Sequence, residues 1–149
     1  MEAVLLIGIQ ASGKSTFCRQ RFFDSHIRVN LDMLKTRHRE KRLVEVCLET
    51  GQPFVVDNTN PTREDRQRYI GLAKAAGFRI IGYYFQSRVE ECQRRNEARV
   101  ESECIPLPGI LGTYKRLEVP SVDEGFDELH YVRIAADDSF VVEEWSDEV

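Results

Sequence analysis

Two short segments of the chain combine residue types that can do chemistry, and each follows an apolar run. Gly8 to Ser15 reads GIQASGKS and ends the run that starts at Ala3. Asp57 to Asn60 reads DNTN and follows the apolar residues Phe54 to Val56. A buried strand has no packing reason to end on a carboxylate and two amides, because such groups are costly to bury without partners. We therefore expect both segments to face a ligand.

The segment Gly8 to Ser15 matches GxxxxGK[ST], the pattern of a phosphate-binding loop. An apolar strand pattern precedes it and a helix is expected from about Lys14 to Phe23, so the context that the pattern requires is present. The backbone N–H groups of such a loop and the helix N-terminus attract phosphate. The residues expected to bind ATP or another nucleoside triphosphate are Gly8, Gln10, Ala11, Ser12, Gly13, Lys14, Ser15 and Thr16.

Two residues of this loop have separate expected roles. The Lys14 ammonium is expected to reach the β- and γ-phosphates and to act in catalysis, and the Ser15 hydroxyl is expected to bind Mg²⁺. A glycine-rich turn that matches by chance is the alternative, but it would not be expected between a strand and a helix. The pattern leaves open whether phosphate goes to water, to a small molecule or to a polymer.

Strand and helix patterns alternate over most of the chain, which predicts an α/β fold with a mainly parallel sheet of about five strands flanked by helices. No linker or repeat is legible, so residues 1–149 are expected to form a single domain. The expected strands are Ala3–Ile9, Ile27–Asn30, Phe54–Val56, Arg79–Phe85 and Leu129–Ile134, with Phe140–Trp145 as a candidate edge strand. Helices are expected near residues 14–23, 43–50, 62–76, 89–99 and 110–117.

Ligands of parallel sheets lie beyond the carboxyl ends of the strands. This rule places the turns after Ile9, Asn30 and Val56 on one rim. Asp32 follows the expected second strand there, where a carboxylate could orient an acceptor hydroxyl and take its proton as a general base. The alternative is that Asp32 only caps the next helix, which is a common place for an Asp side chain.

Charge is distributed unevenly along the chain, whose net charge is −4. Residues 1–120 carry 20 Lys and Arg against 15 Asp and Glu, whereas residues 121–149 carry 1 against 10. A basic body suits a polyanionic ligand. Within it, the run Lys35 to Arg42 has five basic residues and one Glu. This run is either a solvated helix face or a surface that holds the phosphates of an oligonucleotide.

The sequence also bears on cellular compartment and on cysteine-based metal sites. No apolar run approaches the roughly 20 residues that span a bilayer, and no signal-peptide pattern opens the chain. We therefore expect no membrane partner and a cytoplasmic location. The four cysteines are scattered without the spacing of a zinc site or a disulfide framework, so neither is expected.

Four motifs together resemble the kinase domain of polynucleotide 5′-kinases, the end-healing enzymes of nucleic-acid repair. They are GxxxSGKST at the phosphate loop, NxD at Asn30 to Asp32, VxDNTNP at Val55 to Pro61 and RNxxR at Arg95 to Arg99. The similarity runs from Val4 to about Phe126. Many families share the phosphate loop, whereas DNTNP combined with the later arginines is much more selective.

The resemblance implies a P-loop kinase fold with a small lid, ATP and Mg²⁺ as cofactors, and a nucleic-acid 5′ end as the substrate. Asp32 would be the general base for the 5′-OH group, and Asp57 would join Ser15 at the metal. Arg99, with Arg95, would clamp the transferring phosphoryl group, whose spread charge a guanidinium can meet with two donors. From the residues alone, a solvated helix face is the favoured interpretation of Arg94, Arg95 and Arg99.

The polar segment Asp57 to Asn60, which follows the third expected strand, is expected to have two roles. Some of its side chains would cap the next helix, with Pro61 in the first turn, and others would face the acceptor. The candidate acceptor-binding residues are Asp32, Lys35, Asp57, Asn58 and Asn60.

Two departures from the family pattern affect the acceptor side. Some members carry Arg at the positions of Leu31 and Lys35. Lys lacks the planar fork of Arg. The expectation that the site holds an acceptor phosphate tightly is therefore weaker, and a different acceptor substrate remains an alternative. No DxDGT phosphatase motif or ligase lysine motif is present, which makes a separate phosphatase or ligase a candidate partner.

Three functions remain open at this point. The first is an ATP-dependent kinase of the 5′-OH end of DNA, RNA or an oligonucleotide. The second is a small-metabolite or antibiotic kinase on the same fold, and the third is a nucleotide-binding regulatory module with little turnover. Intact Lys14, Asp32 and Asp57 argue against the third. Nothing in the sequence separates DNA from RNA or ATP from GTP, and nothing indicates the oligomeric state.

Overall fold

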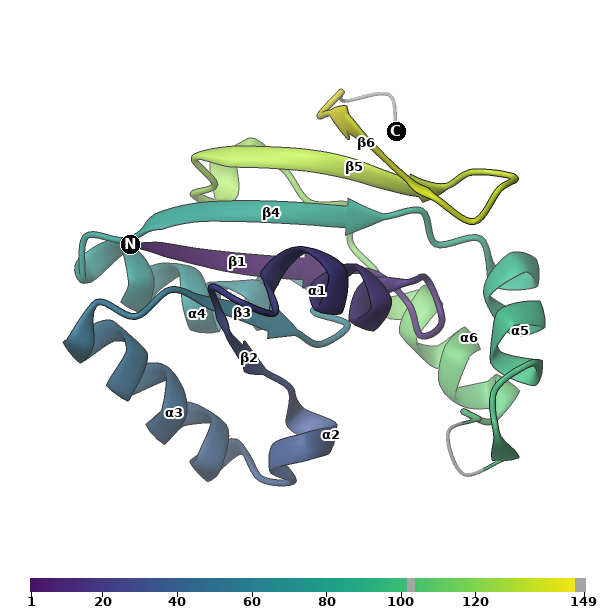
Figure 1. The fold of residues 1–149 in the computed structure, drawn as a ribbon, viewed down its shortest axis with the longest axis horizontal. Helices are drawn as coiled ribbons and strands as arrows, with labels where there is room; N and C mark the ends of the chain where they lie inside the picture. The colour runs from purple at the N-terminus through teal and green to yellow at the C-terminus, as the bar shows by residue number, and fades with distance from the viewer. Residues whose placement is uncertain (102–103, 147–149) are drawn as a thin grey trace.

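The computed structural model describes residues 1–101 and 104–146. Its sheet has six strands in the order β2-β3-β1-β4-β5-β6 (Figure 1). The strands are β1 (Glu2–Ile7), β2 (Ile27–Val29), β3 (Phe54–Asp57), β4 (Arg79–Phe85), β5 (Glu128–Ile134) and β6 (Phe140–Glu144). The first five are parallel and β6 runs antiparallel to β5. The predicted α/β fold is confirmed, and the candidate edge strand makes the sheet one strand wider than the expected five.

The predicted helices lie where they were expected, but several begin or end at other residues than predicted. They are α1 (Lys14–Phe22), α2 (Leu31–Leu34), α3 (Arg37–Thr50), α4 (Arg63–Ala75), α5 (Val89–Glu97) and α6 (Leu107–Arg116), followed by the short 3₁₀ helix η2 (Val122–Glu124). The separate helix α2 was not predicted. It stops at Lys35, whose φ of 75° is left-handed, and Thr36 then caps α3 by accepting a hydrogen bond from the backbone N–H of Arg39.

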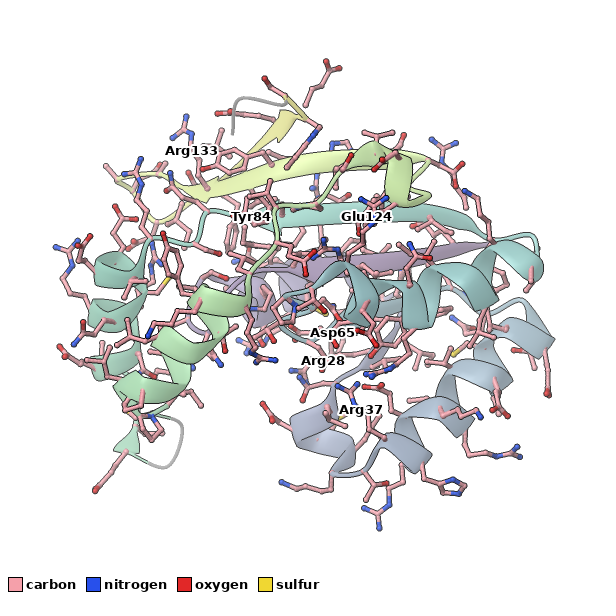
Figure 2. All side chains as sticks on the ribbon, turned by 180° about the vertical axis from the view of Figure 1, so that it is seen from behind. Arg28, Arg37, Asp65, Tyr84, Glu124 and Arg133 are labelled. Carbon is pink, nitrogen blue, oxygen red and sulfur yellow. The ribbon has the colours of Figure 1, made fainter. Side chains whose placement is uncertain are left out.

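The core lies on both faces of the sheet, with β1 at its centre. Residues 3–7 of β1 are fully buried, as expected for a parallel strand that is covered on both sides. Leu5 and Ile7 pack with α3 and α4 on one face, and Val4 and Leu6 pack with α1 on the other. Figure 2 views the molecule from behind, where η2 lies against α4 and brings Glu124 to it.

The turn between β3 and α4 differs from the prediction. Pro61 was expected in the first helical turn, but Thr62 is the N-cap and α4 begins at Arg63. The reason is a capping box, in which Thr62 accepts from the backbone N–H of Asp65 and the Asp65 carboxylate accepts from the N–H of Thr62. Pro61 therefore precedes the cap and shapes the turn.

Helices α5 and α6 lie together beyond the carboxyl ends of β1 and β4 (Figure 1). The Asn96 side chain closes the segment between them, because it donates to the Ile105 carbonyl at 2.6 Å and accepts from the Ile105 N–H at 2.8 Å. Helix α5 ends at Glu97, two residues earlier than predicted, so Arg99 lies outside it. No helix within residues 1–101 and 104–146 is both long and apolar enough to cross a bilayer.

Candidate functional site

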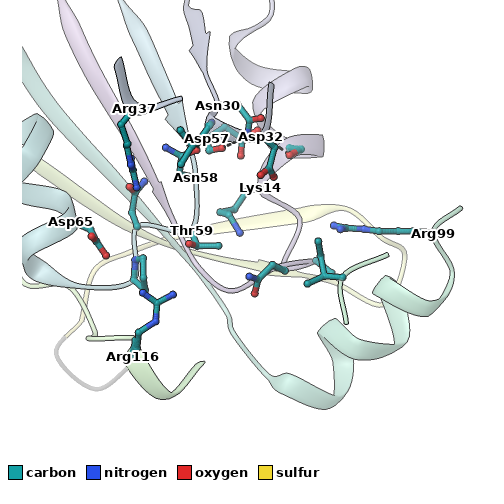
Figure 3. A pocket seen from close by; sticks show the side chains of 17 residues that line it. Lys14, Asn30, Asp32, Arg37, Asp57, Asn58, Thr59, Asp65, Arg99 and Arg116 are labelled. Carbon is teal, nitrogen blue, oxygen red and sulfur yellow. Dashed lines mark hydrogen bonds between the residues drawn. The ribbon is translucent and has the colours of Figure 1, made fainter. Parts of the chain in front are cut away.

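A cavity of about 330 Å³ lies at the carboxyl ends of the strands. Its walls include Lys14 and Ser15 of the phosphate loop, Asp32 in α2, the segment Asp57 to Asn60, and Arg99 from beyond α5 (Figure 3). The parallel topology thus brings residues from separate parts of the sequence to one rim.

The phosphate loop leaves its helix N-terminus open. Gly13 precedes α1 with a left-handed φ of 102°, and within the described part of the chain no side chain caps the first N–H groups of the helix. A Cβ at Gly13 would lie 2.9 Å from the Phe140 ring, so β6 supports the loop from outside. N–H groups without a protein acceptor at a helix start are suited to bind an anion.

Lys14 is buried within the loop that it is expected to serve. Its Nζ atom donates to the carbonyl oxygens of Gly8 at 2.8 Å and Ile9 at 2.7 Å. Burial lowers the pKa of Lys14 from 10.5 to about 8, and the nearby charge of Asp57 opposes this shift. An anionic ligand in the loop would favour the charged ammonium.

The hydroxyl of Ser15 and the carboxylate of Asp57 meet at the base of the cavity. Ser15 Oγ donates to Asp57 Oδ2 at 2.9 Å, and Asp57 is almost fully buried. Arg28 neutralises the carboxylate through its Nε atom, also at 2.9 Å from Oδ2. A hydroxyl and a carboxylate oxygen at this separation are hard ligands that fit Mg²⁺, which commonly takes one or two protein ligands beside phosphates and water.

Asp32 lies in α2 and lines the cavity, but it is not the residue that caps this helix. The N-cap is Asn30, whose Oδ1 atom accepts from the Met33 N–H at 2.9 Å and whose Nδ2 atom donates to the Asp57 carbonyl at 2.6 Å. The alternative that Asp32 is the helix cap is therefore wrong. Its side chain is exposed, and no described residue forms a hydrogen bond or ion pair with its carboxylate.

The two asparagines of the DNTN segment line the cavity, but their amides are engaged within the protein. Asn58 accepts from the Leu31 N–H at 2.9 Å and donates to Glu40 at 3.0 Å. Asn60 has a left-handed φ of 46° and donates to the Leu6 carbonyl at 2.8 Å. The Thr59 carbonyl accepts from the Gly8 N–H at 3.0 Å. The segment therefore holds the rim together and also forms one wall of the cavity.

Of the other expected site residues, some line the cavity and some do not. Lys35 and Thr16 are exposed and do not line it. Arg95 does not line it either, because its guanidinium donates to the Ala11 carbonyl at 3.1 Å and lies near Glu91. Arg99 does line it (Figure 3). The two expected lid arginines thus occupy different environments.

The sequence profile of the AAA domain family matches residues 32–109, which are more than half of the chain. The chain belongs to the AAA domain family. The family match starts at Asp32 and does not include the phosphate loop at Gly8 to Ser15. The loop is identified from its own sequence pattern and geometry.

The curated relatives of this AAA domain agree with the motifs. A bifunctional polynucleotide phosphatase/kinase from Schizosaccharomyces pombe is 33% identical over 135 residues, which are 88% of this chain and 33% of that protein. A putative bifunctional polynucleotide phosphatase/kinase of Acanthamoeba polyphaga mimivirus is 26% identical over 147 residues, which are 94% of this chain and 35% of that protein. The chain spans about a third of the length of these relatives. The resemblance to polynucleotide kinases is confirmed.

A solved structure extends the likeness of the AAA domain to its whole fold. Chaetomium thermophilum Kti12, determined in complex with ADP-AlF3, matches with a TM-score of 0.70 at 16% identity, over 91% of this chain and 92% of that chain. At this identity the likeness concerns the fold alone. The fold is that of the P-loop kinases, with a mostly parallel sheet flanked by helices.

Several cavity residues of the AAA domain were not singled out from the sequence. Arg37 and Arg116 line the cavity on the side of Lys14 opposite to Arg99 (Figure 3). Arg37 was only one member of a basic run. Arg28 does not line the cavity but contacts Asp57, and it was not identified from the sequence. The alternation of side chains along β2, which puts residues 28 and 30 on one face, was the available signal.

Proposed function

We propose that this AAA domain is a kinase that transfers the γ-phosphoryl group of ATP, or of another nucleoside triphosphate, to the 5′-OH end of DNA, RNA or an oligonucleotide. One observation carries the proposal: the phosphate loop faces the same cavity as the Asp32 carboxylate, which pairs with no described residue. The two relatives named as polynucleotide phosphatase/kinases support a nucleic-acid acceptor.

The donor half of the site would bind the triphosphate. The open N–H groups at the start of α1 and the Lys14 ammonium would hold the β- and γ-phosphates. Ser15 and Asp57 would hold Mg²⁺, which when bound would neutralise phosphate charge. Arg28 would keep Asp57 oriented, since its guanidinium already contacts the carboxylate.

Asp32 would do the chemistry on the acceptor. Its carboxylate would orient the 5′-OH group and accept its proton while the 5′-oxygen forms a bond to the γ-phosphorus. The bond from that phosphorus to the β,γ-bridging oxygen breaks, and the nucleoside diphosphate leaves. Arg99 would donate to the equatorial oxygens of the transferring group, where charge spreads in the transition state.

Arg37 and Arg116 would bind the acceptor strand. Both line the end of the cavity away from Arg99 (Figure 3), and a guanidinium can meet a phosphate with two parallel hydrogen bonds. Lys41 and Arg42 are exposed and do not line the cavity. In this proposal Arg37 would contact the phosphates of the acceptor, whereas Lys41 and Arg42 belong to a solvated helix face.

The test is transfer of labelled γ-phosphate to 5′-OH oligodeoxynucleotides and oligoribonucleotides, in parallel with a panel of sugars, nucleosides and antibiotics. We expect label at the 5′ ends of oligonucleotides and none on ends that already carry phosphate. Label on the small molecules alone would overturn the proposal in favour of a metabolite kinase. No consumption of ATP with any acceptor would instead favour a regulatory module.

A further inference from the structure

The only acidic residue of the basic run Lys35 to Arg42 is buried. Glu40 is 2% exposed, although most of its neighbours in the run are solvated. Burying a carboxylate is costly unless charged or polar partners compensate it. The partners of Glu40 therefore show what this buried charge does.

Three donors converge on the Glu40 carboxylate from three parts of the chain. Its Oε1 atom accepts from Arg37 Nη1 and from the Tyr69 hydroxyl, both at 2.8 Å. Its Oε2 atom accepts from Asn58 Nδ2 at 3.0 Å. The Tyr69 oxygen also lies 3.2 Å from Arg37 and 3.3 Å from Asn58. All four residues thus form one closed hydrogen-bond network.

Two donors of this network, Tyr69 and Arg37, have raised pKa values. Burial raises the pKa of Tyr69 to about 12, with the hydrogen bond and charge of Glu40 adding to the shift. The phenol therefore stays protonated and donates to Glu40. Burial alone would lower the pKa of Arg37, but its hydrogen bond to Glu40 and the charge of Glu40 outweigh this and raise it.

One branch of the network reaches the proposed general base. Asn58 uses its remaining amide oxygen to accept from the Leu31 N–H, which belongs to the residue directly before Asp32. Helix α2 has four residues and none of them is fully buried, although Leu34 at its end packs partly against the core. Its first turn is also held by hydrogen bonds in which the Leu31 N–H donates to Asn58 Oδ1 and the Met33 N–H donates to Asn30 Oδ1.

The other branch ends on the acceptor side of the cavity. Arg37 is half exposed, and its guanidinium is tied to Glu40 while its side chain lines the cavity. Removing the carboxylate would free a long side chain with many rotamers. One buried group thus supports both the base-bearing turn and an arginine of the proposed strand-binding end.

We infer that Glu40, assisted by Tyr69, is the positioning residue of the acceptor half of the site, placing Asp32 through Asn58 and placing Arg37 directly. This inference rests on the proposed function for the roles of Asp32 and Arg37. The hydrogen-bond network itself does not depend on which acceptor is phosphorylated.

The substitution Glu40→Gln tests the inference with little change in shape. The new amide would present an N–H group to the Asn58 N–H group, so Asn58 must turn its amide around to make a hydrogen bond. Its oxygen would then face residue 40, and the Leu31 N–H would lose its acceptor. The matched control is Glu45→Gln in the same helix, where the carboxylate pairs with Arg42 at the surface.

We expect Glu40→Gln to lower kcat for transfer by about 10- to 100-fold, the scale of a misplaced catalytic group, and to raise the KM for the oligonucleotide. The Kd for ATP should stay within about twofold of the wild type, because the donor half is untouched. Tyr69→Phe should show the same pattern more weakly, and Glu45→Gln should show neither change. Equal losses of transfer and ATP binding in Glu40→Gln, or no loss at all, would overturn the inference.

A readout without activity separates this inference from the proposed function. Amide hydrogen exchange at Leu31 should be faster in Glu40→Gln and Tyr69→Phe than in the wild type and in Glu45→Gln, while the amides of β1 stay equally protected. Unchanged exchange at Leu31 would overturn the positioning role. Absence of transfer to 5′ ends by the wild type would overturn the proposed function, and the exchange result would still stand. If Glu40→Gln does not fold, Tyr69→Phe decides both measurements.

Discussion

Arg66 and Glu124 form a two-bonded ion pair from which solvent is excluded. The Nε and Nη2 atoms of Arg66 donate to the two carboxylate oxygens of Glu124 at 2.7 and 3.0 Å, and the two side chains are 0% and 1% exposed. The remaining nitrogen of Arg66 donates to the carbonyls of Asn60 and Pro61. The pair therefore joins α4 and η2 to the turn that carries the DNTN segment.

Breaking one side of this pair should destabilise the fold strongly. We expect Arg66→Met or Glu124→Gln to lower the free energy of unfolding by about 3–5 kcal/mol, because the remaining partner is left buried without its counter-charge. The double variant Arg66→Met/Glu124→Gln should be less destabilised than the sum of the singles. Denaturant unfolding measures all three. Asp123→Asn, in an exposed pair with Arg63, is the control and should leave stability unchanged.

Loss of the Asp32 carboxylate should separate catalysis from binding. We expect Asp32→Asn to reduce transfer by about 100- to 10,000-fold, the contribution of a general base, while ATP binding and thermal stability remain. Stability should remain because Asn30, not Asp32, caps α2. Transfer kinetics and ATP titration check this result against Asp24→Asn, a surface control. Near wild-type turnover of Asp32→Asn would exclude the general-base role.

The lowered pKa of Lys14 should make nucleotide binding take up protons at alkaline pH. The folded-state pKa is about 8 against an ordinary 10.5, so above pH 8 the unliganded lysine loses its proton while the unfolded chain keeps it up to about 10.5. The contribution of Lys14 to stability therefore rises with pH between these values. Phosphate in the loop favours the charged form, so binding near pH 8.5 should bring a proton back.

Calorimetric titration of ATP at pH 8.5 in buffers of different ionisation enthalpy measures this uptake. We expect net uptake by the wild type, and none at pH 6.5, where Lys14 is already charged. Lys14→Arg should show no uptake attributable to this position, because arginine stays protonated. Equal proton uptake by the wild type and Lys14→Arg would contradict the assignment.

Two glycines should respond in opposite directions to alanine. Gly13→Ala places a Cβ against Phe140 and Ile134 at 2.9 and 3.1 Å and strains a φ of 102°, so we expect loss of stability and of ATP affinity. Gly71 lies within α4 and has nothing within 4 Å of its Cβ position. Gly71→Ala should therefore add about 0.5–1 kcal/mol of stability. Thermal unfolding and ATP titration of both variants provide the comparison.

Local patterns in the sequence predicted most of the fold. The five parallel strands follow from apolar runs, and the helix expected near residues 62–76 is α4, which Thr62 caps. The separate helix α2 was not predicted, since its stop depends on the left-handed backbone at Lys35. The early end of α5 was missed because the bonds of Asn96 to Ile105 join residues on either side of a turn.

For the site, the sequence by itself determined the phosphate loop, the candidate base Asp32 and the carboxylate Asp57, because motif spacing and strand context are local properties. Only the tertiary structure decided that Arg28 neutralises Asp57 and that Glu40 is the buried centre of a network. The physical reason is that hydrogen bonds and burial depend on which distant elements pack together. A charge such as Glu40, which looks solvated in its own helix, acquires its role from Asn58 and Tyr69, 18 and 29 residues further along the chain.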